Sequence, residues 1–395
     1  MRLYEHEAKL LFGKLGIPLP KSALAVSKDD AVKAAAEIGF PVVLKSQVLT
    51  GGRGKAGGIK IAKDEKDLKS QSESLFNLKI KGYLVKSILV EKALDINREL
   101  YLGVTLNRAD YKITIIASDS GGVDIEKVAV ESPERIHRVE LEIDDEFYRF
   151  QGVQLAGKLG IASSQVREFA DIACKLFEFY KSYDAKLAEI NPLVITKAGE
   201  FVAADARVSL DDDALFRHPD LSQMGIEKRH EEGELTPREI QAREWGIPYL
   251  DLDGDIGMFP GGAGFGIMGN DFIHYFGGKP ANFMDSGGGP SPERIARMLV
   301  LLDENPQVKV IFGARFGGIS RCDDFAKGVV KFLREHGLSK PMVMRMTGNM
   351  WQEGVRIFEE ARTETPDLFK NIDFHGIEVP IEDIARKAVE LAKGG

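Results

Sequence analysis

The alternation of apolar and polar positions divides the chain into an irregular first half and a regular second half. The first half opens with three stretches of helical spacing, at residues 5–15, 31–38 and 64–75. It also contains three short apolar runs, at residues 42–45, 59–62 and 86–91. Alternating β patterns follow at 99–105 and 111–118, a mostly polar connection reaches about residue 148, and residues 164–180 predict an amphipathic helix. We therefore expect a small α/β lobe over about residues 20–95, followed by a larger lobe.

From residue 251 onward, short apolar strands alternate with helices. Strands are predicted at residues 255–259, 281–285, 308–312, 342–346 and 372–374. Helices are predicted at residues 265–276, 292–302, 321–336, 352–362 and 381–393. This alternation predicts an α/β domain with a doubly wound parallel sheet. The charged segment 218–245 is interpreted as a connection, which places one domain at residues 1–237 and a second at 245–395.

A glycine-rich loop separates two predicted strands of the small lobe. Residues 51–58 read Gly-Gly-Arg-Gly-Lys-Ala-Gly-Gly, and Lys45 ends the strand before them. Glycines let the backbone approach a ligand closely, and consecutive backbone N–H groups can hold an anion. With Arg53 and Lys55 adding positive charge, the loop predicts a flap over nucleotide phosphates. A tight hairpin without a ligand is the alternative, and the loop lacks the ending of a Walker P-loop. Glu91 ends a later strand, where it either lines a cleft between lobes or is solvated.

Three oxygen-bearing side chains lie on a predicted hairpin over residues 185–207. Period-2 geometry puts Glu189 and Asn191 on one face. With the turn centred on Ala198, Asn191 and Asp205 are equally far from it, so we expect them to be cross-strand partners. Glu189, Asn191 and Asp205 could then share one Mg²⁺, which prefers oxygen ligands. The alternative is a half-exposed hairpin with a polar face.

Glycine-rich loops also follow four strands of the predicted second domain, at residues 261–264, 286–290, 317–320 and 347–349. Ligands of such sheets bind beyond the carboxyl ends of the strands, and helix N-termini favour anions. The loops therefore predict a bound anion or carboxylate. Arg315, Arg321 and Arg345 lie near them and could bind carboxylates through paired hydrogen bonds. For each arginine, a structural salt bridge is an equal alternative.

Composition narrows the functional classes. The formal net charge of −8 argues against a nucleic-acid partner or an anionic membrane surface. Two cysteines cannot form a disulfide framework, which favours a reducing, cytoplasmic compartment. The first residues do not resemble a signal peptide, and no apolar run approaches the ~20 residues that span a bilayer.

Together, these motifs resemble a known family. Lys45, the loop 51–58, Glu91, Glu99-Leu-Tyr-Leu-Gly, Glu189-Ile-Asn-Pro-Leu-Val and Asp205 resemble the ATP-grasp half of the β subunits of acyl-CoA synthetases. The resemblance continues through Ala214-Leu-Phe-Arg, Pro280-Ala-Asn-Phe, Gly287-Gly-Gly and Gly317-Gly-Ile-Ser-Arg-Cys-Asp. It implies a two-lobed ATP-grasp domain followed by a flavodoxin-like CoA-ligase domain.

The resemblance also implies roles for the matching residues. The residues expected beside ATP are Lys45, Gly52, Arg53, Gly54, Glu91, Leu94 and Glu99. Asn191 and Asp205 would bind Mg²⁺, with Glu189 added by the hairpin geometry. The residues expected beside the acid substrate are Gly261, Gly262, Gly317, Gly318, Ile319, Ser320, Arg345 and Asn349.

Two departures within the family bear on the substrate. Gly261 stands where succinyl-CoA synthetases have an asparagine, and Ser320 replaces an apolar residue. The run Gly348-Asn-Met-Trp-Gln-Glu-Gly-Val-Arg is similar to a run of the ATP-citrate lyases. Residues 313–319 keep the succinate-type pattern. We therefore expect a citrate–CoA ligase of the ATP-citrate lyase or citryl-CoA synthetase type. The alternative is a succinyl-CoA synthetase β subunit, and a malate–CoA ligase lies between the two.

The resemblance further implies a partner. None of the seven histidines lies in the Gly-His-Ala-Gly-type loop that carries the family's phosphohistidine, so that histidine is expected on an α-type subunit. The α-type subunit would also hold most of the coenzyme A site, and in lyases it would cleave citryl-CoA to acetyl-CoA and oxaloacetate. The chain alone is expected to be inactive. A self-contained ATP-grasp carboxylase or amine ligase, and a nucleotide-sensing module without catalysis, are alternatives from other classes.

Overall fold

The chain forms two compact units, Met1–Glu234 and Leu235–Gly395, in a computed structural model that describes residues 1–50, 52–227 and 235–394. Gly51, the first residue of the predicted flap, lies outside the described residues. The second unit begins before residue 245, where the sequence placed it, because helix α8 (Pro237–Glu244) belongs to it. Arg238 and Glu239 of this helix bind Asp251 of the same unit.

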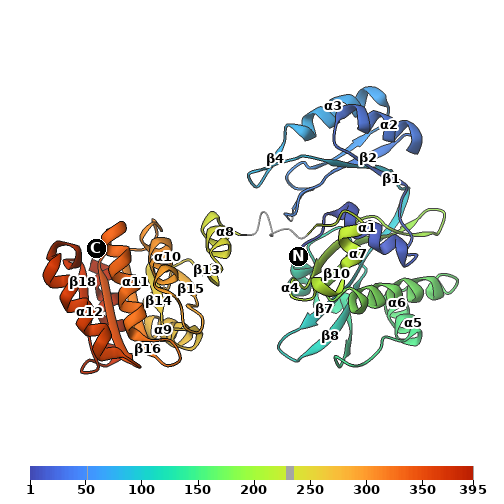
Figure 1. The fold of residues 1–395 in the computed structure, drawn as a ribbon. Helices are drawn as coiled ribbons and strands as arrows, with labels where there is room; N and C mark the ends of the chain where they lie inside the picture. The colour runs from blue at the N-terminus through green and yellow to red at the C-terminus, as the bar shows by residue number, and fades with distance from the viewer. Residues whose placement is uncertain (51, 228–234, 395) are drawn as a thin grey trace. The chain divides into compact units, whose positions relative to one another are not determined.

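The first unit carries a small lobe built on an antiparallel sheet with the strand order β1-β6-β2-β3. Its strands are β1 (Ser22–Ala25), β2 (Val42–Ser46), β3 (Ile59–Ala62) and β6 (Ile88–Lys92). A short hairpin is formed by β4 (Lys79–Ile80) and β5 (Tyr83–Leu84). Helices α2 (Lys28–Ile38) and α3 (Glu65–Phe76) cover one face of the sheet (Figure 1). Ser27 and Asp64 cap these two helices, as Ser and Asp commonly do.

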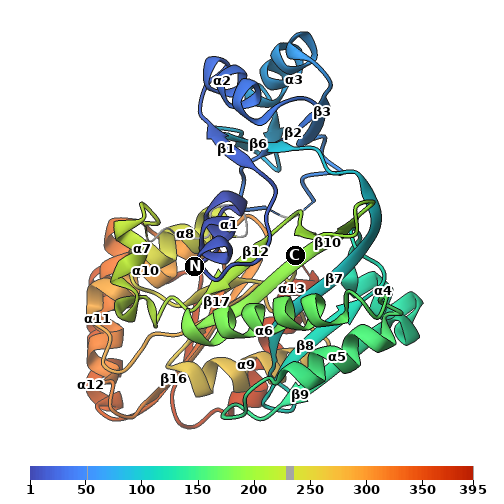
Figure 2. The same cartoon turned by 90° about the vertical axis from the view of Figure 1, so that its right-hand side faces the viewer.

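The larger lobe of the first unit is a six-stranded antiparallel sheet with the order β11-β10-β7-β8-β9, in which β12 also pairs with β10. Its strands are β7 (Ile96–Asn107), β8 (Lys112–Ser118), β9 (Ile136–Leu141), β10 (Ala185–Thr196), β11 (Phe201–Ala203) and β12 (Arg207–Leu210). Its helices are α1 (Glu5–Lys14), α4 (Ile125–Glu131), α5 (Arg149–Lys158), α6 (Val166–Ser182) and α7 (Pro219–Gln223). Three-residue 3₁₀ turns lie at Pro133–Arg135 and Leu215–Arg217. Helices α5 and α6 run across the sheet (Figure 2), and α1, α5 and α6 contribute to one apolar core.

Strand β9 corrects one expectation. The interval after residue 123 was interpreted as a polar connection, but it contains α4 and the edge strand β9. β9 pairs with β8 from Ile113 opposite Leu141 to Ser118 opposite Ile136. Its outward residues are charged, as is common on edge strands, so the polar sequence concealed it.

The predicted hairpin around Ala198 is present with the expected register. Leu193 lies opposite Ala203 in the β10–β11 pair, and Glu189 lies opposite Arg207 in the β10–β12 pair. Both pairs are centred on Ala198, so Asn191 and Asp205 occupy facing positions. Asp205 lies in the break between β11 and β12, so no ladder pair joins it to Asn191 of β10.

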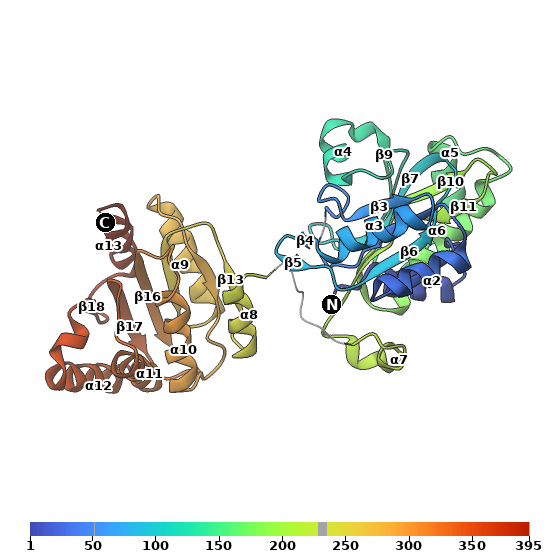
Figure 3. The ribbon, with the colours of Figure 1, turned by 90° about the horizontal axis from the view of Figure 1, so that it is seen from above.

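The second unit is built on a parallel sheet with the order β14-β16-β17-β18. Its strands are β14 (Ile256–Pro260), β16 (Val310–Gly317), β17 (Met342–Gly348) and β18 (Ile372–His375). Its remaining helices are α9 (Ala263–Tyr275), α10 (Pro292–Asp303), α11 (Cys322–Glu335), α12 (Trp351–Glu364) and α13 (Ile381–Gly394), with a 3₁₀ turn at Pro366–Phe369. Figure 3 shows α9 and α13 on one side of the sheet and α10, α11 and α12 on the other. The predicted doubly wound arrangement is confirmed.

One predicted strand meets this parallel sheet only at its start, where the Ala281 N–H donates to the Ile256 carbonyl of β14 at 2.8 Å. β15 (Asn282–Met284) pairs antiparallel with β13 (Tyr249–Asp251). The buried Asn282 side chain replaces much of the missing ladder, because its amide accepts from the Met258 N–H at 2.8 Å and donates to the Met258 carbonyl at 3.1 Å. Across the described residues, we find no helix with both the length and the apolar character needed to cross a membrane.

Candidate functional site

One large cavity of the first unit joins the glycine loop to the hairpin. Its volume is about 1450 Å³. Gly52, Arg53 and Gly54 line it from the small lobe. Glu189, Asn191, Asp205 and Glu99 line it from the larger lobe. The two sequence signals that predicted a nucleotide site and a metal site therefore meet in one space.

Arg53 lies between two carboxylates in this cavity. Its Nη2 donates to both carboxylate oxygens of Asp205, each at 2.9 Å, and its Nη1 donates to Glu5 at 2.7 Å. Burial opposes the charge on Arg53, but Asp205 and Glu5 outweigh burial and raise the pKa of the guanidinium. Arg53 is thus a permanent cation that can exchange a carboxylate for a phosphate.

Lys45 lies behind the cavity wall. Its Nζ is 2.9 Å from Glu5 and 2.8 Å from Glu91, and it also donates to the Ala204 carbonyl. Burial disfavours the ammonium, but the two carboxylates raise the pKa of Lys45 above its ordinary value. Lys9 contacts the same two carboxylates, with Glu5 at 2.9 Å. The predicted phosphate-binding lysine is therefore held in a buried ionic network.

Glu5 and Lys9 are the residues that sequence reasoning missed. Both are buried on α1, one turn apart, and Glu5 touches the cations of Lys9, Lys45 and Arg53. Burial raises the pKa of Glu5, but Lys45, Lys9 and Arg53 together bring that pKa well below its usual value. A lysine and a glutamate on the buried stripe of a helix were the available signal, since such residues are rarely buried unless paired.

The hairpin presents oxygen donors of the type that Mg²⁺ prefers. The Asn191 amide nitrogen lies 3.3 Å from Glu189 and donates to the Val123 carbonyl at 2.9 Å, while its oxygen accepts from the Gly122 N–H at 2.8 Å. Glu189 is largely buried, and this burial raises the pKa of its carboxyl. Glu189 and Asn191 thus share a face as predicted, whereas Asp205 lines the same cavity in contact with Arg53. Within the described ranges, no three His, Cys, Asp or Glu side chains cluster as a metal site. The donor set here is two carboxylates and an amide, which suits a hard cation.

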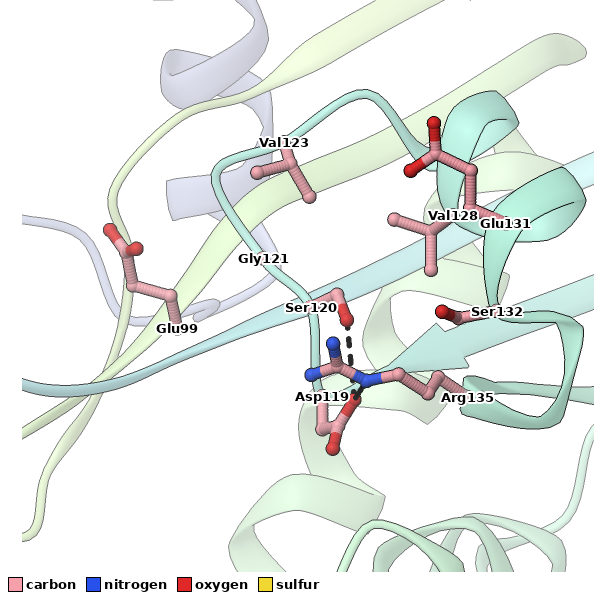
Figure 4. A pocket seen from close by; sticks show the side chains of 9 residues that line it. All are labelled: Glu99, Asp119, Ser120, Gly121, Val123, Val128, Glu131, Ser132 and Arg135. Carbon is pink, nitrogen blue, oxygen red and sulfur yellow. Dashed lines mark hydrogen bonds and ion pairs between the residues drawn. The ribbon is translucent and has the colours of Figure 1, made fainter.

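Of the residues predicted beside the nucleoside, some line the cavity and others do not. Glu91 is buried against Lys9 and Lys45. Leu94 follows β6 and does not line the cavity. Glu99 lines the large cavity and also a neighbouring pocket of about 420 Å³ (Figure 4). In that pocket Arg135 Nε donates to Asp119 at 2.7 Å.

In the second unit, the predicted substrate residues gather at the carboxyl ends of three strands. Gly261 follows β14 and donates to the Ala314 carbonyl of β16 at 3.0 Å. Asn349 donates from its backbone to Gly317 at 2.6 Å and from its side chain to Gly318 at 3.3 Å. Gly262, Ile319 and Ser320 lie in the same loops, and Ile319 is 92% exposed. The loops after β14, β16 and β17 are thereby brought together.

The three arginines near these loops have different partners. Arg321 binds both oxygens of Asp323 at 2.8 Å, which is the structural salt bridge considered above. Arg345 donates to the Val379 carbonyl at 2.6 Å and to Thr347 at 3.4 Å. Arg315 is 1% exposed, and its three guanidinium nitrogens make no hydrogen bond within the described residues.

Comparisons with known proteins support this division of the chain. A family profile described as an ATP-grasp domain matches residues 2–195, and one described as a CoA-ligase matches residues 259–367. The chain is 40% identical over 393 residues to the β subunit of an ADP-forming succinate–CoA ligase from Ignicoccus hospitalis, with both chains fully covered. It is 41% identical over 399 residues to the corresponding protein of Aquifex aeolicus, at 99% coverage of each. A GDP-forming relative from Thermus thermophilus is 40% identical over 360 residues, or 91% of this chain and 93% of that one.

A solved structure of ATP citrate lyase from Methanothrix soehngenii, in complex with citrate and coenzyme A, shares the fold. Its TM-score is 0.70 and its sequence identity 20%, with 98% of this chain and 99% of that chain covered. At this identity the likeness concerns the fold alone. An ATP-grasp domain followed by a CoA-ligase domain defines the class: a β-type subunit of a nucleoside-diphosphate-forming acyl-CoA ligase. Within that class, the chain belongs to the succinyl-CoA synthetase β-subunit family. The predicted fold class is confirmed.

Proposed function

We propose that the chain binds Mg·ATP or Mg·GTP in the large cavity and, with an α-type subunit, activates a di- or tricarboxylic acid as its CoA thioester. The observation that carries this proposal is the meeting of Arg53, Glu189 and Asn191 in one cavity. Phosphoryl transfer depends mainly on positioning and on neutralising charge around the phosphates. Cationic and oxygen-donor groups facing one another across the cavity provide both.

Each group of the cavity has a specific task in this proposal. Arg53 and the backbone of Gly52 and Gly54 hold the phosphates, and Lys45 supports them from behind. Glu189, Asn191 and Asp205 hold Mg²⁺, which when bound neutralises charge on the phosphate oxygens. When the phosphates bind, Arg53 would exchange its contact with Asp205 for a contact with phosphate, which would leave the Asp205 carboxylate available to Mg²⁺. Glu91, Leu94 and Glu99 are assigned to the nucleoside side of the site. Of the three, Glu99 lines the cavity.

The phosphate acceptor is assigned to the partner. No histidine lines the cavity in the part of the chain that the structure describes. We therefore place the phosphohistidine, and most of the coenzyme A site, on an α-type subunit. The acid would bind at the loops of the second unit, among the residues Gly261, Gly262, Gly317, Gly318, Ile319, Ser320, Arg345 and Asn349.

Succinate is the first candidate acid, and the comparisons favour it over the citrate expected from the sequence. Relatives about 40% identical over nearly the whole chain are named succinate–CoA ligases. Citrate is the second candidate, and it rests on the sequence departures at Gly261 and Ser320. In the structure Arg315 fills the position that a side chain at residue 261 would take, since a Cβ there would lie 2.7 Å from the Arg315 Cδ. Since relatives named both ADP-forming and GDP-forming match the chain, both nucleotides belong in the test.

The test is to co-express the chain with an α-type subunit and measure CoA-dependent release of ADP or GDP. Succinate, citrate and malate are compared at equal concentration, with the β chain alone as the control. We expect turnover only in the complex, with succinate preferred. Turnover by the isolated chain would contradict the proposal, as would a complex that is inactive with all three acids.

A further inference from the structure

In the described part of the second unit, one buried cation, Arg315, has no carboxylate partner. The three guanidinium nitrogens of Arg315, on β16, have no hydrogen-bond partner within the described residues. The guanidinium carbon lies 5.0 Å from the ring centroid of Phe325, which stabilises a cation less than a carboxylate would. An unpaired buried charge lowers stability, so this arrangement is unfavourable unless an anion completes it.

The surroundings of Arg315 add positive potential. Gly261 beside it leads into Gly262, the N-cap of α9, and Cys322 beside it begins α11. Neither helix has a side-chain cap on its N-terminus, and helix N-termini attract anions. The proximity of Arg315 to Cys322 is also electrostatic: burial raises the pKa of that thiol, and Arg315 opposes the rise.

The one buried carboxylate near the start of α11 is already paired. Asp323 accepts two hydrogen bonds from Arg321 at 2.8 Å and one from Lys327 at 3.0 Å. It therefore does not neutralise Arg315. A buried guanidinium and two uncapped helix N-termini thus meet at the carboxyl ends of β14 and β16, where ligands of such sheets bind.

Gly261 makes the position of Arg315 possible. A Cβ at residue 261 would lie 2.7 Å from the Arg315 Cδ and 3.1 Å from the Phe316 backbone nitrogen. A Cβ at Gly264, in the first turn of α9, would meet no atom within 4 Å. Arg315 can therefore take this position only because residue 261 has no side chain.

We propose that Arg315 binds a non-reacting carboxylate of the acid substrate and selects acids that carry more than one carboxylate. This inference rests on the proposed function, which brings such an acid to these loops. The guanidinium would form two parallel hydrogen bonds to the carboxylate, and the N–H groups at the starts of α9 and α11 would supply further donors. The loop that begins at Gly261 moves aside to admit the carboxylate.

Thermal unfolding of the full chain tests the inference without turnover. Succinate, citrate, butyrate and phosphate are compared with sodium chloride at matched ionic strength. We expect succinate or citrate to raise the midpoint and butyrate, which has one carboxylate, to leave it unchanged. Arg315→Met should be at least as stable as wild type without ligand, because it removes an unpaired buried charge. The Arg315→Met variant should bind the acid about 10- to 100-fold more weakly, as expected for losing a paired charged contact.

Gly261→Ala, with Gly157→Ala as its control, forms a second test. The Gly261→Ala variant displaces Arg315 and should weaken binding of the acid. The neutral control is Gly157→Ala on α5, where a Cβ would meet no atom within 4 Å and which lies in no proposed site, so this variant should bind the acid as the wild type does. The inference is overturned if Arg315→Met keeps the acid-dependent shift or if neither acid shifts the wild-type midpoint. It is also overturned if phosphate shifts the midpoint of the wild type but not that of Arg315→Met, because Arg315 would then be a phosphate site. If Arg315→Met does not fold, an acid-dependent shift in Gly261→Ala equal to that of Gly157→Ala overturns it equally. An acid that binds through Arg315 in a complex without CoA-dependent nucleotide release would defeat the proposed function and leave this inference standing.

Discussion

Arg53 of the glycine loop holds both carboxylate oxygens of Asp205 at 2.9 Å, and so links the small lobe to the hairpin of the larger lobe. The two residues have opposite tasks in the proposed site, one toward phosphate and the other toward Mg²⁺. Their mutual contact keeps both charges compensated in the absence of nucleotide. Arrival of the metal–nucleotide complex would exchange this one contact for two.

Removing the Asp205 side chain should abolish phosphoryl transfer without unfolding the chain. We expect Asp205→Ala to abolish Mg·ATP-dependent phosphorylation of the partner subunit, because a proposed metal ligand is lost. The fold should persist, since the Asp205 side chain is partly exposed at 29%. Radiolabel transfer and thermal unfolding measure the two effects. Asp171→Ala, which breaks an exposed pair with Arg149, is the control. Undiminished phosphate transfer in Asp205→Ala would remove the metal role.

Glu5 should support the ionic network in a pH-dependent way. Its pKa is lowered by Lys45, Lys9 and Arg53 in the folded chain, so its contribution is present above the unfolded pKa of about 4.3. That contribution is lost as the pH falls through the still lower folded value. Glu5→Gln should cost about 3–5 kcal/mol at pH 7, as for breaking a buried ion pair, and should flatten the acid limb of the stability curve.

Urea unfolding at several pH values measures this effect. Glu73→Gln provides the comparison, because Glu73 forms an exposed pair with Lys28 and exposed pairs contribute little. Equal stability of the wild type and Glu5→Gln at pH 7 would show that the cations do not depend on this carboxylate.

Asn282 should fix β15 against the parallel sheet and thereby the loop that contains Gly261. Asn282→Ala leaves the backbone N–H and carbonyl of Met258 without this partner, which should lower the free energy of unfolding by about 1–3 kcal/mol. Denaturant unfolding of the full chain measures it. Asn77→Ala, which removes an exposed bond to the Glu73 carbonyl, should change stability by much less. A loss no larger than that of Asn77→Ala would contradict the structural role.

The predictable parts of this chain are those with strong local patterns. The βα repeats of the second unit were predictable because their apolar period changes at each glycine loop. The hairpin register was predictable because the distance from Ala198 fixes which residues face one another. The exposed, charged strand β9 and the antiparallel pairing of β15 were not, since edge position and side-chain hydrogen bonds are tertiary properties.

In the candidate site too, local motifs were predictable from the sequence and tertiary contacts were not. The glycine loop and the oxygen donors were visible as motifs, and the cavity contains both. The ionic network around Lys45 was harder to predict, because Glu5 and Lys9 are distant from Lys45 in sequence, and only their place on the buried stripe of α1 marked them. Equally, nothing local distinguished Arg315, whose guanidinium has no hydrogen-bond partner among the described residues, from Arg321, which binds Asp323.

The ionic network at the cavity wall contains three cations, Lys9, Lys45 and Arg53, and three carboxylates, Glu5, Glu91 and Asp205. Its formal charges cancel before any ligand arrives. A bare polyphosphate would therefore introduce repulsion that these fixed groups cannot absorb, whereas a polyphosphate already partnered by a divalent ion would not. We expect the enzyme to discriminate between metal-free and metal-complexed nucleotide at the binding step itself, ahead of any chemistry.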